Sequence, residues 1–317
     1  MAAEGVIGVL GNLLVCFVIL RVKFLHSMTN YLLVNLAVAD MLLCLQEFFL
    51  YLMYSDISLL DFVPTSVGGR ELYCRLLGSD FLAWALVYAS AYNLCVVTLE
   101  RYVAIVHPLQ YERKLTATRM KSLIALIWVI SFLFSSPYLF TIESSTDPDQ
   151  ACSKLKDHHQ EFQMLLKVFT FFMGYLLPIT LMSLAYYKIQ VTLKRQAKAL
   201  NLRHARAAAY DLVIARQRLV SMLMIVLGAL IILWTPVYTA ILVCAYPLHK
   251  GLISFCDSDT YEFIVEFMDF FHYFNSVINP IIYELKYKKF RKGVKVAFCS
   301  CVKRKWNNRV DIEMVPK

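Results

Sequence analysis

Long apolar runs separated by short polar stretches dominate the chain, and they predict helices rather than strands. Residues 81–99 contain no Lys, Arg, Asp or Glu, and a helix of about 19 residues crosses the ~30 Å of hydrocarbon in a bilayer. Windows of this kind give seven predicted spans, near residues 5–22, 30–54, 74–105, 121–140, 163–191, 217–246 and 262–284. Because backbone groups in hydrocarbon must pair within their own segment, these spans predict one helical bundle.

The fold class predicted is therefore an all-α membrane protein with a seven-transmembrane bundle over residues 1–285. A basic amphipathic run follows over 286–298 and predicts a short interfacial helix, which leads into a cytoplasmic tail ending at 317. A composition of 59% hydrophobic and 17% charged residues agrees with a polytopic membrane protein. The first span is apolar only over 6–20 and must borrow flanking residues to cross. We therefore expect a natural start upstream, and no cleavable signal is recognisable.

The basic residues predict the orientation. All but six of the 32 Lys and Arg residues fall on the side that carries the chain's C-terminus, and basic residues accumulate in short cytoplasmic loops. The C-terminus is thus predicted to be cytoplasmic. These charges are spread over every inner loop, which argues against nucleic acid as a partner.

Acids within the apolar runs are the candidate functional groups. A charge at the bilayer centre costs from ~2.5 kcal/mol upward, yet Asp40 and Glu47 lie in the second span, two turns apart on one face. A ligand-gated receptor and a transporter that relays protons or cations through Asp40, Glu47 and Asp269 both fit such acids. The chain shows no internal repeat, which favours the receptor. With no nucleophile and base pair and no His/Cys metal cluster, an enzyme is not predicted.

Seven motifs in order resemble those of the rhodopsin-like (class A) G-protein-coupled receptors, over nearly the whole chain. Among these receptors, the neuropeptide receptors resemble the chain most. They are Gly11-Asn12, Leu36-Ala-Val-Ala-Asp40, Glu100-Arg101-Tyr102, Trp128, Pro178 with Tyr186, Trp234-Thr-Pro236, and Asn275-Ser276 with Asn279-Pro280-Ile-Ile-Tyr283. Each motif alone is weak, whereas the ordered set on the expected helices is specific.

The resemblance implies a switch. Helix six would swing outward about its proline, and the arginine at the end of helix three would then contact a heterotrimeric G protein; arrestin and a plasma-membrane location are implied as well. The residues assigned to coupling and switching are Glu100, Arg101, Tyr102, Tyr186, Trp234, Pro236, Asn279, Pro280 and Tyr283. One departure is that Arg216-Gln-Arg218 stands where the family often has an acid to pair with the arginine. Only Glu100 is left for Arg101, so raised basal activity is expected.

The resemblance also implies a sodium site and a disulfide. The sodium site would use Asp40, Ser90, Asn275 and Ser276, and oxygen ligands suit this hard cation; no other metal or cofactor is predicted. The family's disulfide corresponds to Cys74 and Cys152. The segment from Cys74 to Arg101 is about two residues longer than usual in the family, so a bulge or extra turn is expected near Gly78.

The ligand is predicted from charge and from the pocket positions that the resemblance supplies. Candidate pocket residues are Glu47, Trp84, Tyr88, Tyr238, Asp269 and Tyr273. Ala83 stands where amine receptors carry an acid, and the last span has no lysine for retinal. Glu262, Glu266 and Asp269 form one acidic stripe on helix seven. An acidic outer mouth favours a cationic or amidated neuropeptide, with a small amine or other non-peptide ligand as the alternative.

Four further cysteines carry predictions. Cys299 and Cys301 directly follow the basic amphipathic run, where juxtamembrane cysteines are candidates for palmitoylation and contact with membrane lipid. Cys244 and Cys256 lie in or beside one outer loop, so that a second disulfide and two free thiols remain equally open.

Overall fold

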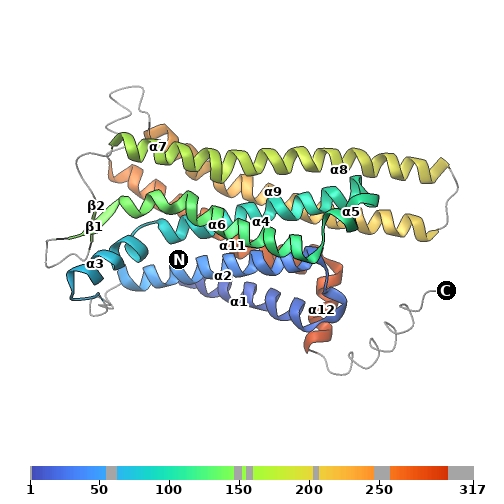
Figure 1. The fold of residues 1–317 in the computed structure, drawn as a ribbon, viewed down its shortest axis with the longest axis horizontal. Helices are drawn as coiled ribbons and strands as arrows, with labels where there is room; N and C mark the ends of the chain where they lie inside the picture. The colour runs from blue at the N-terminus through green and yellow to red at the C-terminus, as the bar shows by residue number, and fades with distance from the viewer. Residues whose placement is uncertain are drawn as a thin grey trace.

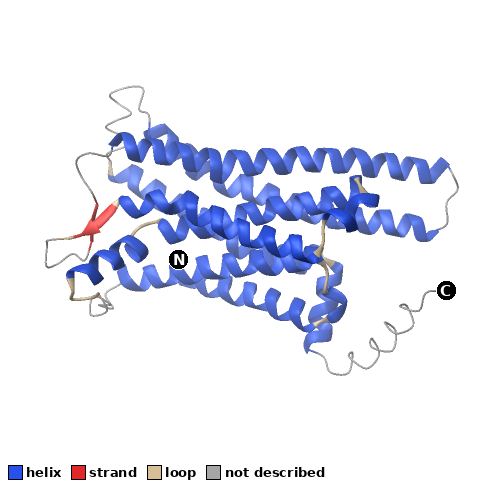
Figure 2. Ribbon diagram, in the orientation of Figure 1, coloured by secondary structure: helices blue, strands red, loops and turns tan. Residues whose placement is uncertain are grey.

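Long helices lie side by side in the computed structural model, which describes residues 2–54, 63–145, 152–154, 160–202, 207–245 and 258–298 (Figure 1, Figure 2). One end of the bundle carries a small hairpin and a disulfide, and a short helix crosses the other end. We call these the disulfide end and the α12 end.

Each of the seven predicted spans corresponds to a long helix. These are α1 (Ala2–Arg21), α2 (Met28–Tyr54), α4 (Phe81–Val106), α6 (Ala117–Ser135), α8 (Leu177–Leu202), α9 (Ala207–Ala245) and α11 (Asp259–Lys286). Short segments connect or extend them: η1 (Lys23–Leu25), α3 (Val67–Tyr73), η3 (Cys74–Gly78), α5 (Pro108–Lys114), η4 (Ser136–Phe140), α7 (Gln160–Thr170), η5 (Phe171–Leu176) and α12 (Lys288–Phe298). Strands β1 (Ile142–Ser144) and β2 (Cys152–Lys154) pair antiparallel.

The helix boundaries that differ most from the sequence prediction are those of α8 and α9. α8 continues to Leu202, past the predicted limit at 191, and α9 already begins at Ala207 rather than near 217. Both extensions lie at the α12 end and contain basic and small residues, so an apolar window does not detect them. α1 starts at Ala2 and reaches its 20 residues by recruiting the turn before the apolar run, which gives about 30 Å at 1.5 Å per residue.

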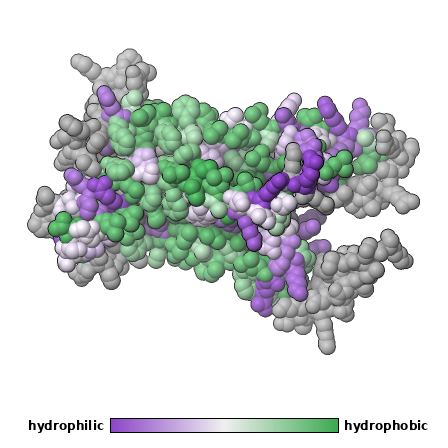
Figure 3. All heavy atoms as spheres, viewed as in Figure 1, coloured by the Kyte–Doolittle hydropathy of each residue, from purple (hydrophilic) through white to green (hydrophobic). Residues whose placement is uncertain are grey.

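Six of the described helical segments are long and apolar enough to cross a membrane. α11 is not among these segments, and its sequence contains five acidic residues: Asp259, Glu262, Glu266, Asp269 and Glu284. It is nevertheless 28 residues long and packs between α1 and α9 as the seventh helix of the bundle. Figure 3 shows apolar residues gathered over the middle of the bundle and polar residues toward both ends, as a membrane-spanning body requires.

The third span is broken where the sequence predicted a bulge. Cys74–Gly78 form a π-helical segment, and the chain leaves the helix at Ser79 before α4 begins at Phe81. A π-segment accommodates extra residues in a wider turn. The Cys74–Cys152 disulfide lies on this segment, with an S–S distance of 2.01 Å. A Cβ added to Gly78 would lie 3.1 Å from the Cys152 Sγ, so this glycine permits the close approach of β2.

Candidate functional site

The charged motif that ends helix three forms a buried cluster at the α12 end. The side chain of Glu100 is fully buried, and the guanidinium of Arg101 donates to both of its carboxylate oxygens. Thr29 of α2 donates to Oε2 at 3.0 Å, and Tyr111 of α5 donates to Oε1 at 2.6 Å. Three side chains from three helices therefore satisfy this buried acid, and loss of any one of them would cost free energy.

Neither Thr29 nor Tyr111 was identified from the sequence. Pro108 occupies the first position of α5, where proline favours the start of a helix, and the short helix that follows carries Tyr111 back to Glu100. Burial, together with the hydrogen bond to Glu100 and the charge of Glu100, raises the pKa of the Tyr111 hydroxyl to about 12. The hydroxyl therefore stays protonated and donates a hydrogen bond at every physiological pH.

A cavity of about 420 Å³ opens beside Arg101 at the α12 end. Its walls come from α4, α9 and the junction of α11 with α12, and include Ala215, Leu219 and Tyr287 together with basic residues of α9 and α12. Glu100 is the ion-pair partner of Arg101 among the described residues, and the side chain of Asp211, the acid of α9, lies outside them. Tyr287 also donates to Asn30 Oδ1 at 3.1 Å, which fixes the α11–α12 junction against α2.

The other predicted switch residues lie in the core of the bundle. Tyr186 on α8 is buried and accepts a hydrogen bond from Thr98 Oγ1 on α4 at 2.8 Å. Tyr283 is also buried, with its ring 6.5 Å from that of Phe290 in α12 and its hydroxyl without a hydrogen-bond partner in the described chain. Tyr102 instead faces the edge, where its hydroxyl lies 3.4 Å from His107 Nε2.

Prolines lie within two of the helices. Pro236 is inside α9, two residues after the buried Trp234, and Pro280 is inside α11. Each removes one backbone hydrogen bond from its helix and creates a local bend. The Cβ of an added side chain at Gly11 would lie 3.2 Å from Pro280 Cγ, so α1 approaches α11 closely at the second proline.

Asp40 is fully buried at the centre of a polar cluster. Its Oδ1 accepts hydrogen bonds from Ser90 at 2.9 Å and Ser276 at 3.0 Å, and its Oδ2 accepts one from Asn279 at 2.8 Å. Two members of the predicted set, Ser90 and Ser276, thus contact Asp40. Asn275 Oδ1 is instead buried without a hydrogen-bond partner in the described chain. Asn279, one turn further along α11, makes the third contact to Asp40.

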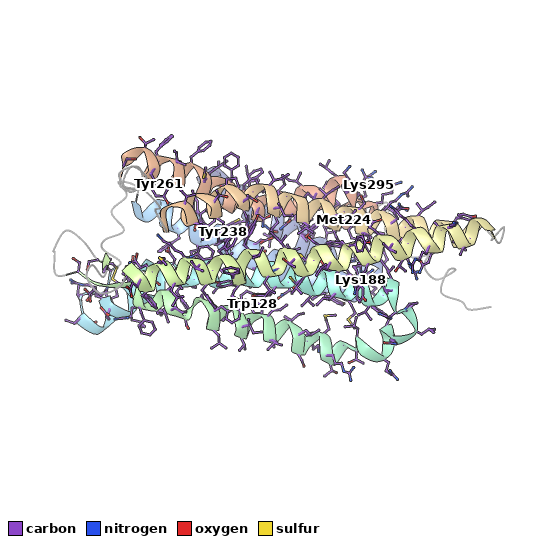
Figure 4. The ribbon with its side chains drawn as sticks, turned by 90° about the horizontal axis from the view of Figure 1, so that it is seen from above. Trp128, Lys188, Met224, Tyr238, Tyr261 and Lys295 are labelled. Atoms are coloured by element: carbon purple, nitrogen blue, oxygen red, sulfur yellow. A yellow bond between two sulfur atoms is a disulfide. The ribbon has the colours of Figure 1, made fainter. Side chains whose placement is uncertain are left out.

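Aromatic rings pack around Tyr238 toward the disulfide end, between α4, η5 and α9. The ring centroids of Trp84, Phe171, Tyr175 and Trp234 lie 4.8 to 6.3 Å from that of Tyr238. Figure 4 marks Tyr238 between the helix ribbons. Its side chain is almost wholly buried, and its hydroxyl has no hydrogen-bond partner in the described chain. We call these five residues the aromatic cluster.

Tyr88 borders the aromatic cluster and is tied to the neighbouring helices. Its hydroxyl donates to Thr170 Oγ1 at 3.2 Å, and Tyr138 reaches the same oxygen at 2.9 Å. A Cβ on Gly174 would lie 3.0 Å from the Tyr88 ring and 3.2 Å from the Tyr238 hydroxyl. The absence of a side chain at Gly174 therefore lets η5 pack directly on these rings.

The predicted pocket residues divide into two groups. Trp84, Tyr88 and Tyr238 meet in or beside the aromatic cluster, whereas Glu47 and Tyr273 line a narrow crevice between α1, α2 and α11 that also contains Glu4. The side chain of Asp269 lies outside the described part of the structure, as do the side chains of Glu262 and Glu266.

One alanine and one acid lie near the start of α4 at the disulfide end. Ala83 is buried on α4, and Asp80 precedes the first residue of that helix and lines a separate cavity of about 220 Å³. The predictions for Cys256, Cys299 and Cys301 and for the side chain of Cys244 lie outside the described residues.

Comparison with known families identifies the class of protein that this fold defines. Residues 11–283 match the family described as "7 transmembrane receptor (rhodopsin family)". The chain belongs to that family, so it is a multi-pass membrane protein and a signalling receptor rather than an enzyme or transporter. Receptors of this family bind an extracellular ligand and couple to G proteins.

Several curated receptors are similar to the chain. Neuromedin-U receptor 2 of Rattus norvegicus is 30% identical over 305 residues, which cover 91% of this chain and 71% of that receptor. The histamine H2 receptor of Homo sapiens is 31% identical, covering 94% and 78%. Trace amine-associated receptor 6 of Pan troglodytes is 27% identical, covering 92% and 82%. Receptors named for a peptide and for amines thus match to a similar degree.

Proposed function

We propose that the chain is a plasma-membrane receptor in which a basic or amidated peptide binds at the disulfide end and a G protein binds at the α12 end. In this orientation the α12 end and the C-terminus are cytoplasmic, which agrees with the excess of Lys and Arg in the segments at that end.

The observation that carries the coupling proposal is the position of Arg101. It borders the 420 Å³ cavity between α4, α9 and the α11–α12 junction, and Glu100 is the acid that holds it. Outward movement of α9 about Pro236 would widen this cavity and let Arg101 turn from Glu100 toward a G protein, and arrestin would use the same opening. The cluster of Glu100 with Thr29, Arg101 and Tyr111 then defines the inactive state, because its hydrogen bonds hold α2, α4 and α5 together.

Asp40 is the proposed site of a sodium ion that favours the inactive state. Its carboxylate brings together the hydroxyls of Ser90 and Ser276 and the amide nitrogen of Asn279, and carboxylate and hydroxyl oxygens are ligands that a hard cation accepts. Asn279 lies directly before Pro280, so a cation at Asp40 would bias the bend of α11.

A peptide ligand is supported by charge and by one relative. The acids Glu47 and Asp269 are the proposed partners for an arginine of the ligand, and α4 has the apolar Ala83 where a small amine would need an acid. Neuromedin-U receptor 2 is a relative whose name refers to a peptide. The aromatic cluster would contact apolar or aromatic side chains of the same peptide.

An amine is the alternative ligand, favoured by the similarity to receptors named for histamine and trace amines. Its ammonium group would pair with Glu47 or Asp269 on α2 or α11 instead of an acid on α4. Both ligand classes therefore share the acids, and the size and sequence of the activating ligand distinguish them.

A screen of basic peptides, acidic peptides, amines and lipids against the purified receptor, read as nucleotide exchange on a panel of G proteins, tests the proposal. For a basic peptide, Asp269→Ala should lower potency roughly 10- to 100-fold, since a hydrogen bond to a charged group contributes ~1.5–3 kcal/mol. Glu143→Ala is the matched control, an exposed acid on β1 at the same end, and should leave potency nearly unchanged. Activation by an anionic or neutral lipid ligand, or equal effects of the two variants, would refute the peptide proposal.

A further inference from the structure

Basic side chains line the cavity beside Arg101, and no acid is among the described residues that line it. The six cations are Arg101, Arg216, Arg218, Lys286, Lys288 and Lys289. Arg101 is compensated by Glu100, whereas the other five make no ion pair within the described chain. The described wall of this cavity of about 420 Å³ is thus strongly positive, and Glu100 compensates Arg101 but none of the other five cations.

This arrangement favours a ligand that carries several negative charges close together. Like charges around a cavity repel one another, and low-dielectric walls focus their field into it. A monovalent anion would compensate one cation at a time. Clustered phosphate groups would compensate several at once, and Arg216 and Arg218 can each donate two parallel hydrogen bonds to a phosphate.

The surroundings of the cavity place it beside a membrane surface. Lys288 and Lys289 begin α12, whose basic residues alternate with the buried Phe290 and with Phe298, which is 61% exposed. A helix with one basic and one apolar face lies in the interface of a bilayer. Ala215, Leu219 and Tyr287 give the cavity an apolar wall as well, which suits a headgroup attached to a lipid better than a free ion.

We propose that this cavity binds the phosphorylated inositol headgroup of an anionic phospholipid from the leaflet at the α12 end. Its phosphate monoesters contact the guanidinium groups of Arg216 and Arg218 and the ammonium group of Lys289. Because the G protein is proposed to enter the same cavity, the lipid regulates access to Arg101. That consequence rests on the proposed function, whereas lipid binding itself does not.

The test measures lipid binding to the full chain in nanodiscs without any G protein. Nanodiscs of phosphatidylcholine are doped with a fluorescent phosphatidylinositol bisphosphate, or with phosphatidylserine at equal total charge, and energy transfer from a dye on the receptor reports occupancy. The wild type should prefer the bisphosphate lipid. Arg216→Gln with Arg218→Gln should weaken its binding roughly a hundredfold, since each replaced guanidinium loses direct hydrogen bonds to a charged phosphate, which contribute ~1.5–3 kcal/mol.

The matched control is Lys188→Gln with Lys295→Gln, which removes two charges that do not line the cavity; Figure 4 labels both residues. It should change binding less than threefold. Equal losses in the two double variants, or no preference for the bisphosphate lipid over phosphatidylserine, would overturn the proposal. Binding of soluble inositol trisphosphate without binding of the lipid would overturn its assignment to the membrane. A failure of G-protein coupling would leave the lipid measurement unaffected, so the two proposals fail separately.

Discussion

Replacing Tyr111 with phenylalanine removes one hydroxyl from the buried cluster around Glu100 and keeps the ring. The lost hydrogen bond, 2.6 Å long, goes to a carboxylate whose side chain is fully buried. A bond to a charged group contributes ~1.5–3 kcal/mol, and the lower value applies here because Tyr111 itself is partly exposed. The inactive state, which contains this bond, should therefore lose about 1.5 kcal/mol relative to the active state.

That loss sets the size of the expected signal. With the active state populated in about 1% of molecules, a shift of ~1.5 kcal/mol raises this fraction to roughly 10%. Ligand-independent nucleotide exchange on a G protein, measured with purified receptor in nanodiscs, should rise accordingly. Glu100→Gln should raise it further, because it also removes the charge that holds Arg101.

Tyr187→Phe is the matched control, since Tyr187 is a tyrosine of α8 that is 70% exposed, and it should leave basal exchange unchanged. Tyr111→Phe should add little once Glu100 is replaced, because the two changes act on one contact. Wild-type basal exchange in both Tyr111→Phe and Glu100→Gln at matched receptor amounts would refute the reasoning. So would full additivity in the double variant, since Tyr111 would then act on another partner.

The remaining predictions concern other parts of the bundle. Asp40→Asn should blunt the ligand response and abolish any difference in thermal stability between sodium and choline buffers; a retained sodium effect would place the ion elsewhere. Cys152→Ser should lower the free energy of unfolding by at most ~4.5 kcal/mol, the loop-entropy value for a crosslink of this span between residues 78 positions apart; an unchanged melting temperature would show that the bundle restrains the hairpin without it. Joint replacement of Cys299 and Cys301 by serine should remove acyl-exchange labelling, and unchanged labelling would exclude palmitoylation there.

The sequence was sufficient for the helices because each apolar run has the length that a bilayer imposes. It was insufficient at their ends, where the basic extensions of α8 and α9 leave the apolar region and only packing between the helices determines their limits. α11 shows the complementary case. Its acids lower its hydropathy, yet Asn279, Pro280 and Tyr283 still identified it, because motifs depend on residue identity rather than on mean polarity.

Residue-level geometry was harder to predict than the motifs. Asn275 and Asn279 lie four positions apart on one face of α11, so spacing alone could not decide which amide reaches Asp40. Tyr111 lies in a polar loop, and nothing in the sequence indicates that it contacts Glu100. The contact becomes evident only in the structure, where α5 folds back on α4. The spacing of aromatic residues along a helix does not distinguish a ligand pocket from a packed core. In the structure Trp84 and Tyr238 contact one another in the aromatic cluster.

Asn12 joins the beginning of the chain to its end. Its Nδ2 donates to Gly8 O within α1 and, at 2.9 Å, to Ser276 O on α11, while α1 also packs on α2. During synthesis α1 enters the membrane first and α11 last of the seven. The hydrogen bond from Asn12 to Ser276 therefore cannot form until nearly the whole bundle has been translated. An unsatisfied polar group is costly in hydrocarbon. The contact between α1 and α11 is therefore completed only when the last helix has inserted. A nascent chain lacking α11 would keep this polar group unsatisfied and should be retained and degraded by cellular quality control.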